Sequence, residues 1–146
     1  MSAAAETVIR AYYAAFNTGD VEGFLKLLTP DVIHDISQGA REIGKPAFRR
    51  FLGRMNRCYR EQIVDLAVMT EPTGKRAAAE FTVRGTYLKV DKDMPAATGQ
   101  GYVLPAGAFF QLRGGRVARI SNHYNLKDWL AQIGAKPKSK ARARRR

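Results

Sequence analysis

The 146-residue sequence has a single cysteine, Cys58, and only two histidines, His34 and His123. One cysteine cannot form an internal disulfide, and it has no partner at zinc-ligand spacing. A glycine-rich nucleotide loop, a Walker pattern and a GxSxG motif are absent from the sequence as well. We therefore predict no metal site and no cofactor, and we interpret Cys58 as a buried, unreactive thiol.

The sequence also has no run of eighteen apolar residues and no apolar segment behind a basic leader. Membrane-spanning helices and secretory signal peptides need such segments. We therefore expect a soluble, cytoplasmic protein without a membrane partner. A chain of this length suits one domain, and it can bury roughly 68–70% of the surface that its unfolded form exposes. That is enough for a core with an internal pocket.

Acidic residues are scarce, with 13 of them against 25 lysines and arginines, which gives a net charge of +12. Seven of these cations lie in the last eleven residues, KPKSKARARRR, and without them the net charge falls to +5. We therefore divide the chain into a mildly basic domain, residues 1–134, and a basic tail, residues 135–146. The tail has no interleaved aromatics, so we predict only weak, salt-dependent contacts with nucleic acid or acidic lipids.

Apolar residues recur at helical spacing in three early segments. The first spans residues 5–16, the second follows an Asp20 cap and ends before Pro30, and the third begins at Pro46, with Phe51 on its apolar face. Between the second and third helices, DVIHDI has the pattern of a strand, and the following SQGAREIG has the pattern of a turn. The first part of the chain is therefore predicted to be mainly helical.

From about residue 61 the apolar residues alternate with period two, which predicts four strands: EQIVDLAVMT, KRAAAEFTVRGTYLKV, GQGYVLPAGAFFQL and GRVARISNHY. Short turn sequences separate them, and a last helix in NLKDWLAQIG ends at Gly134. Pro105 and Gly107 predict a bulge or sharp bend inside the third of these strands. Helices followed by a long antiparallel sheet predict an α+β fold, and a strongly curved sheet encloses a conical hollow.

Four stretches resemble known families. YYAAFNTGDVEGFLKLLTPDV is similar to the first two helices and the first strand of ketosteroid isomerases, and RCYREQ, GYVLPAGAFFQLRGGRV and YNLKDWLAQIG resemble the steroid delta-isomerase-related, SnoaL-like polyketide cyclase group of the nuclear transport factor 2-like superfamily. The resemblance spans about residues 5–134. It implies a cone-shaped α+β barrel, with three N-terminal helices against a curved, mostly antiparallel sheet and a short C-terminal helix. It also implies a homodimer and a pocket for a small hydrophobic molecule, although one fold hosts several chemistries.

Carried over by position, the resemblance places the oxyanion-hole tyrosine of the isomerases on Tyr12, which is present. The catalytic aspartate of the isomerases falls on Ile36, their second acid falls near Ala108, and the aspartate of the cyclases falls on Asn125. None of these three residues is a carboxylic acid. Asn125 is either a ligand contact or the N-cap of the last helix, and we prefer the cap because Asp128 follows three residues later.

His34 and Tyr12 are the predicted catalytic residues. If Ile36 faces the pocket, alternation puts His34 on the same face and turns Asp35 away. A buried, neutral imidazole there could abstract a proton beside a carbonyl group, or it could only hydrogen-bond a ligand or a neighbour. Tyr12 is likewise either a donor to an oxyanion or a core residue with a satisfied hydroxyl.

The same alternation and resemblance predict the side chains that bind the ligand: Phe16, Ile36, Phe51, Phe81, Val83, Tyr102, Leu104, Ala108, Phe110, Asn122 and Tyr124. Gly85, on the same face, would leave room for that ligand. Arg57, Tyr59 and Glu61 cluster where the third helix meets the sheet. They form either a functional rim or a structural ion pair, and we prefer the ion pair.

The predicted function is that of a ketosteroid isomerase-like or SnoaL-like protein, whose hydrophobic pocket takes a small carbonyl compound for proton-transfer isomerase or cyclase chemistry. The alternative is a non-catalytic small-molecule-binding or dimeric interaction module of the same fold. Turnover that is lost in His34→Ala, with folding and binding retained, would favour the first of these. Ligand binding without turnover would favour the second.

Overall fold

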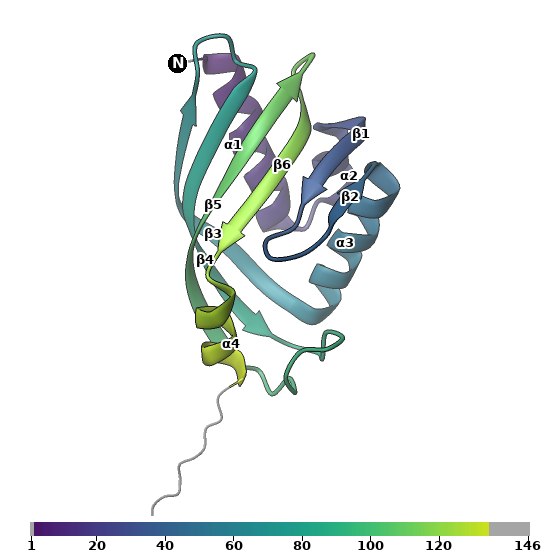
Figure 1. Cartoon of the computed structure of the whole chain (residues 1–146), viewed down its shortest axis with the longest axis vertical. Coiled ribbons are helices and arrows are strands. Elements are labelled where there is room, and N and C mark those ends of the chain that lie inside the picture. Colours follow the sequence, from purple (N-terminus) through teal and green to yellow (C-terminus); the bar gives the residue numbers. More distant parts are fainter. Residues whose placement is uncertain (1, 135–146) are drawn as a thin grey trace, which may run out of the picture.

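The computed structural model describes residues 2–134, and within that range the chain forms four helices and six strands (Figure 1). In chain order these are α1 (Ala3–Thr18), α2 (Val21–Lys26), β1 (Leu28–Asp35), β2 (Arg41–Ile43), α3 (Lys45–Cys58), β3 (Tyr59–Thr70), β4 (Arg76–Tyr87), β5 (Gly101–Arg113), β6 (Arg116–Tyr124) and α4 (Leu126–Gly134). The basic tail, for which weak contacts with anionic partners are predicted, lies outside the described residues.

All six strands form one curved sheet in the order β2-β1-β6-β5-β4-β3. Among these strands, only β1 and β6 pair in parallel, and β2, α3, β3, β4 and β5 lie between them in the chain. Figure 1 shows α1, α2 and α3 on one side of the sheet and α4 at one end of it. The predicted α+β architecture is confirmed, with one correction: part of the predicted turn after β1 forms the short edge strand β2.

Local sequence sets the ends of several helices as predicted. Gly19 adopts a left-handed conformation (φ 72°) after α1, and a carboxylate oxygen of Asp20 accepts a hydrogen bond from the amide of Gly23 at 2.9 Å at the start of α2. At the start of α4, Oδ1 of Asn125 accepts from the amide of Asp128 at 3.0 Å. The prediction that Asn125 caps this helix is therefore confirmed.

The predicted bulge at Pro105 and Gly107 is wrong. Pairing between β4 and β5 passes both residues without a shift in register, and β6 pairs with β5 only from Ala106 on. Pro105 therefore lies just beyond the reach of β6, where its missing N–H costs no hydrogen bond to that strand. The register shifts instead within β3, between Val64 and Ala67, and near the far end of β5.

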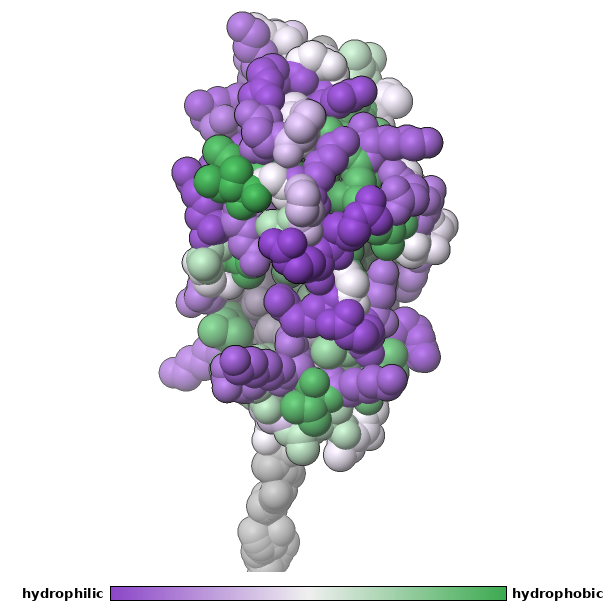
Figure 2. Space-filling model, turned by 90° about the vertical axis from the view of Figure 1, so that its right-hand side faces the viewer, coloured by the Kyte–Doolittle hydropathy of each residue, from purple (hydrophilic) through white to green (hydrophobic). Residues whose placement is uncertain are grey.

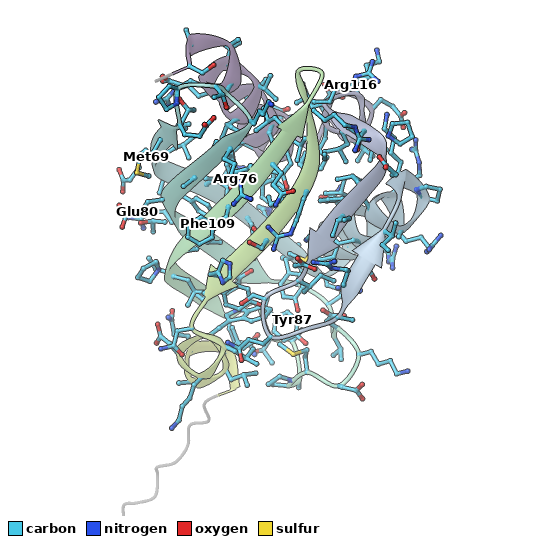
Figure 3. All side chains as sticks on the ribbon, turned by 45° about the horizontal axis from the view of Figure 1, so that its top comes forward. Met69, Arg76, Glu80, Tyr87, Phe109 and Arg116 are labelled. Atoms are coloured by element: carbon cyan, nitrogen blue, oxygen red, sulfur yellow. The ribbon has the colours of Figure 1, made fainter. Side chains whose placement is uncertain are left out.

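Alternation along the strands separates an inner face, toward the helices, from an outer face. On β1, Val32 and His34 are buried, whereas Asp35 points outward to two arginines, as predicted. Phe109 and Glu80 mark the outer face, which the helices do not cover (Figure 3). The core lies between the inner face and the helices.

The side of the molecule that carries α3 is mainly hydrophilic, with apolar residues scattered over it singly (Figure 2). The Cys58 thiol at the end of α3 is buried, as predicted. None of the helices within residues 2–134 is long and apolar enough to cross a membrane.

Candidate functional site

A cavity of about 200 Å³ lies between the inner face of the sheet and the helices. Nine of the predicted site residues line it: Tyr12, Phe16, Ile36, Phe51, Phe81, Val83, Leu104, Asn122 and Tyr124. Residues that were not predicted as ligand contacts also line it, and among them are Tyr13, Arg54, Glu61, Asp91 and Trp129. The inner-face assignment from sequence therefore located the cavity but missed most of its ionisable groups.

Four predicted site residues lie behind the cavity wall, which corrects their assignment as its lining. Ala108 and Phe110 are each 1% exposed and belong to the packed core, where the ring of Phe110 meets that of Tyr12 edge to face at 5.4 Å. Tyr102 is buried and turns its hydroxyl toward Glu61. His34 is the fourth, and its surroundings differ from the predicted ones most of all.

His34 is enclosed by two phenylalanines of α3. Its ring stacks on Phe48 at a centroid distance of 4.3 Å and meets the edge of Phe51 at 4.6 Å, which leaves it 2% exposed. Its Nε2 lies 3.2 Å from the amide nitrogen of Asn122, and its Nδ1 has no hydrogen-bond partner among the described residues. The imidazole therefore reaches the cavity only through Asn122, which lines it.

Burial lowers the pKa of His34 to about 4, because an imidazolium would lose its hydration inside the aromatic enclosure. The Asp35 carboxylate on the next residue works against this effect, and the Arg54 guanidinium adds to it. His34 is therefore neutral at pH 7. A neutral imidazole with one free nitrogen supports the wall as a hydrogen-bonding group, but the enclosure keeps it from a bound molecule.

One end of the cavity is aromatic. The Tyr12 ring lies 4.3 Å from that of Phe24, and the Tyr13 ring lies 5.0 Å from that of Phe81. Burial raises the pKa of both tyrosines, so both hydroxyls keep their protons and can only be neutral donors or acceptors. The Tyr13 hydroxyl is buried and has no partner in the described part of the chain.

The other end of the cavity is polar and lies near α4. Asp91 accepts a hydrogen bond from the Tyr59 hydroxyl at 2.8 Å and pairs with Arg54 at 3.5 Å. The indole N–H of Trp129 is buried here without a partner among residues 2–134. In the same range, no three His, Cys, Asp or Glu side chains are grouped so that they could hold a metal ion. The side chains at this end offer hydrogen-bond donors and acceptors and groups that can exchange a proton.

Glu61 does not form the ion pair that was preferred for it. Its carboxylate accepts a hydrogen bond from the Tyr102 hydroxyl, and no lysine or arginine pairs with it within residues 2–134. Burial raises the pKa of Glu61 to about 6, and the Tyr102 hydrogen bond limits this rise. The half-buried carboxyl lines the cavity, so a bound molecule can reach it.

Gly85 leaves room for Tyr102 and not for a ligand, contrary to prediction. A Cβ at this position would overlap the Tyr102 ring. Sequence alternation alone could have found Glu61, because Tyr59 and Ile63, two residues to either side, are buried on the same face of β3. The hydrogen bond between Tyr102 of β5 and Glu61 of β3 crosses β4, and no sequence pattern within a single strand predicts it.

Comparisons with known proteins agree with this architecture. The model of the SnoaL-like domain family matches residues 9–120.

Three solved structures, each named a "putative polyketide cyclase", are similar over nearly their whole lengths. The one from Pseudomonas putida is 56% identical, with a TM-score of 0.88 over 88% of this chain and 97% of that chain. The one from Xanthomonas campestris pv. campestris is 50% identical, with a TM-score of 0.86 over 88% and 96%. The one from a Silicibacter species is 44% identical, with a TM-score of 0.88 over 90% and 96%. Comparison with curated proteins gives no match.

Proposed function

Because the chain belongs to the SnoaL-like domain family, we propose that it binds a small hydrophobic carbonyl compound in its cavity and catalyses proton transfer beside the carbonyl group. The observation that carries this proposal is a mainly apolar cavity whose wall holds two buried donors without partners among residues 2–134, the Tyr13 hydroxyl and the Trp129 indole N–H. Each such donor costs roughly 1–3 kcal/mol while it is unpaired. A ligand oxygen that accepts from one of them offsets that cost.

The volume of the cavity favours a compact ligand. Pockets for drug-sized molecules measure roughly 300–1,000 Å³, whereas this cavity measures about 200 Å³. An aromatic or bicyclic carbonyl compound suits that volume better than a four-ring steroid does. The aromatic end of the cavity would hold the ring system, and the polar end would hold an oxygen.

Tyr12 and Tyr13 are the proposed donors to the carbonyl oxygen, which becomes an enolate oxygen when the neighbouring carbon loses its proton. A neutral phenol that is held in an apolar site stabilises such a developing charge well. Asn122 offers a further polar contact, and His34 acts through it as a positioning residue. Polyketides, which the names of the similar structures suggest, carry acidic C–H groups between carbonyl groups and suit this chemistry.

The alternative is a binding module without turnover. It is favoured by the three positions at which related enzymes carry carboxylic acids, since this chain has Ile36, Ala108 and Asn125 there, and Asn125 caps α4. In that case the unpaired donors would hold a ligand but no reaction would follow. The two functions differ in a measurable way, because only the first moves a proton.

A panel of hydrophobic ketones and 1,3-diketones, with benzoylacetone and progesterone as its smallest and largest members, tests the proposal. Thermal shift and native mass spectrometry measure binding, and deuterium uptake from D₂O at the carbon beside the carbonyl group measures proton transfer. We expect the smaller diketones to bind and to exchange deuterium faster than they do in buffer. Binding without accelerated exchange would favour the binding module, and a panel without any binder would overturn the proposal.

A matched pair of variants locates the binding. Ala106→Leu adds volume at the cavity wall, whereas Ala78→Leu adds the same volume on β4 at a position that does not line the cavity. We expect Ala106→Leu to abolish the thermal shift caused by the diketone and Ala78→Leu to retain it. Equal loss in both variants would place the ligand outside the cavity.

A further inference from the structure

We propose that Glu61 is the catalytic residue that exchanges a proton with the bound compound, and that Tyr102 positions it, an inference that rests on the proposed function. The family resemblance assigns no role to this glutamate, although RCYREQ, one of the stretches that carry the resemblance, includes it. The related enzymes carry their acids at the positions of Ile36, Ala108 and Asn125. Glu61 lies on β3, whereas Ala108 lies on β5 and the other two positions follow the ends of β1 and β6. A row of paired residues orients the Glu61 carboxyl, which lines the cavity and has no cationic partner within residues 2–134.

Glu61, Gly85 and Tyr102 form one row across three strands. Glu61 of β3 pairs with Gly85 of β4, which pairs with Tyr102 of β5. Because Gly85 has no side chain, the Tyr102 ring lies across β4, and its hydroxyl donates to the Glu61 carboxylate one strand further on. The ring is flanked by Trp129 at 5.7 Å and by Tyr59 at 6.4 Å. The Glu61 carboxyl is therefore oriented by the Tyr102 hydroxyl, whose ring is itself packed against two other aromatic rings.

No cation neutralises this carboxyl within the described part of the chain. A half-buried carboxylate that serves only the fold is normally paired, because an unpaired one lowers stability. Glutamine would accept the same hydrogen bond from Tyr102 without a charge. A carboxyl group that lines the cavity and has no cationic partner within residues 2–134 therefore indicates a chemical role better than a structural one.

The titration of Glu61 suits proton transfer near neutral pH. Burial raises its pKa to about 6, so most molecules carry the carboxylate at pH 7, and that carboxylate is more basic than an exposed one. The other titratable or charged groups at this end of the cavity include Tyr59 from β3, Tyr102 and Tyr124 from β5 and β6, Arg54 from α3, and Asp91 from the loop after β4. The helices α1 and α4 contribute the neutral Tyr13 and Trp129 to the wall.

The proton transfer balances without any co-reactant. The Glu61 carboxylate takes a proton from the carbon beside the carbonyl group, and the C–H electron pair becomes the C=C bond of an enolate. The former C=O pair moves to the oxygen, which accepts a hydrogen bond from a tyrosine hydroxyl. Return of the proton to another carbon completes an isomerisation. Attack of the enolate carbon on a second carbonyl group closes a ring, and the new alkoxide takes the proton back from Glu61.

The test compares deuterium uptake by benzoylacetone in wild type, Glu61→Gln and the control Glu80→Gln, whose side chain is exposed on the outer face of β4. Circular dichroism and the thermal shift with benzoylacetone report folding and binding separately. We expect Glu61→Gln to fold and to bind the diketone, and its exchange to be roughly 100-fold slower or more. Glu80→Gln should exchange at the rate of wild type.

Exchange at the wild-type rate in Glu61→Gln, with binding retained, would overturn the role of Glu61 and leave the proposed function intact. Absence of binding by wild type across the whole ketone panel would overturn both. Binding by wild type without accelerated exchange would also overturn both and leave the binding module. The three failures are therefore distinguishable in one set of measurements.

Tyr102→Phe provides a second test that does not depend on the loss of activity. It removes only the hydroxyl that lowers the pKa of Glu61, so the midpoint of the exchange rate against pH should move upward from about 6. A residue that only filled space would leave this midpoint unchanged. An unchanged or lower midpoint in Tyr102→Phe would overturn the positioning role.

Discussion

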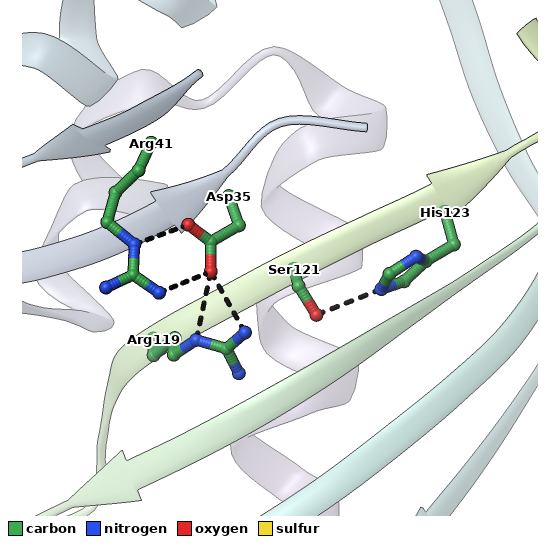
Figure 4. Close-up of polar contacts among 5 residues, drawn as sticks. All are labelled: Asp35, Arg41, Arg119, Ser121 and His123. Atoms are coloured by element: carbon green, nitrogen blue, oxygen red, sulfur yellow. Dashed lines mark hydrogen bonds and ion pairs between the residues drawn. The ribbon is translucent and has the colours of Figure 1, made fainter. Parts of the chain in front are cut away.

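A carboxyl group on the outer face of the sheet and one on the inner face have pKa values that are shifted in opposite directions. On the outer face, Asp35 accepts hydrogen bonds from Arg41 at 2.7 Å and from Arg119 at 3.1 Å, and these partners lower its pKa (Figure 4). On the inner face, Glu61 has a tyrosine as its partner and an apolar cavity beside it, and its pKa rises to about 6. The arginines of the outer face favour the charged form of Asp35, whereas burial on the inner face favours the protonated form of Glu61.

The two histidines show the same contrast. His123 is exposed on the outer face, where its Nε2 lies 3.1 Å from the Ser121 hydroxyl (Figure 4). Its ring centroid lies 5.3 Å from that of Phe109. His34 is enclosed on the inner face, and burial lowers its pKa to about 4. The inner-face histidine is thus enclosed by aromatic rings, whereas the outer-face histidine is in contact with solvent.

The largest expected difference between the two faces comes from two neighbouring phenylalanines of β5. Phe110 is 1% exposed and Phe109 is 56% exposed. We expect Phe110→Ala to lower the free energy of unfolding by about 3–5 kcal/mol, because it leaves a cavity among packed rings. Phe109→Ala should change it by less than about 1 kcal/mol. Urea unfolding measures both, and similar losses in the two variants would contradict the assignment of the faces.

Gly85→Ala tests how tightly the Tyr102 ring packs over β4 on the inner face. The added methyl group would overlap the Tyr102 ring, whereas the nearest heavy atom to a methyl group at Gly101 lies 3.9 Å away. We expect Gly85→Ala to cost about 1–3 kcal/mol of stability through overpacking, and Gly101→Ala to cost less. Thermal unfolding of both variants checks this. A neutral Gly85→Ala would mean that Tyr102 does not need the space over β4.

The pH dependence of stability tests the inner carboxyl directly. Because burial raises the pKa of Glu61 from its ordinary value near 4.5 to about 6, the folded protein holds this proton more tightly than the unfolded chain does. The resulting stabilisation is fully present below about pH 4.5 and is lost as the pH rises through about 6, a change of about 2 kcal/mol.

Glu61→Gln removes this dependence. The free energy of unfolding of Glu61→Gln, minus that of wild type, should therefore rise by about 2 kcal/mol as the pH rises from about 3.5 to about 7. His34 titrates in both proteins and cancels in the difference. Urea unfolding at several pH values measures it, with Glu80→Gln as the control that should give a constant difference. A constant difference in Glu61→Gln as well would mean that the inner carboxyl is not perturbed.

The smallest expected effect belongs to the outer face. The Arg41 and Arg119 hydrogen bonds lower the pKa of Asp35, so its stabilisation is present above the ordinary value near 3.8 and is lost as the pH falls below it. The three side chains are partly exposed to solvent. We therefore expect Asp35→Asn to cost less than about 1 kcal/mol at neutral pH, and high salt to reduce that cost. A larger, salt-independent loss in urea unfolding would contradict this account of the outer face.

Short-range features were predictable because short-range rules decide them. The caps at Asp20 and Asn125 follow from a polar side chain next to a helical pattern, and the outward turn of Asp35 follows from alternation along a single strand. The resemblance over nearly the whole domain supplied the fold. It also placed the cavity on the inner face, where Ile36 and Asn122 do line it.

The site itself depended on contacts between elements that are far apart in the sequence. The enclosure of His34 is made by Phe48 and Phe51 from α3, and no pattern within β1 shows how closely that helix approaches. The contact between Glu61 and Tyr102 needs the register of three strands and a glycine in the middle one. The predicted homodimer stays a prediction.

The most direct measurement is an NMR titration of the glutamate side-chain carboxyl carbons in ¹³C-labelled protein, since it needs no knowledge of the substrate. Comparison with Glu61→Gln identifies the Glu61 signal. The account predicts that this signal titrates with a pKa of about 6 in wild type and at a higher value in Tyr102→Phe. A Glu61 signal that titrates at or below the ordinary value near 4.5, or one that Tyr102→Phe leaves unchanged, would contradict it.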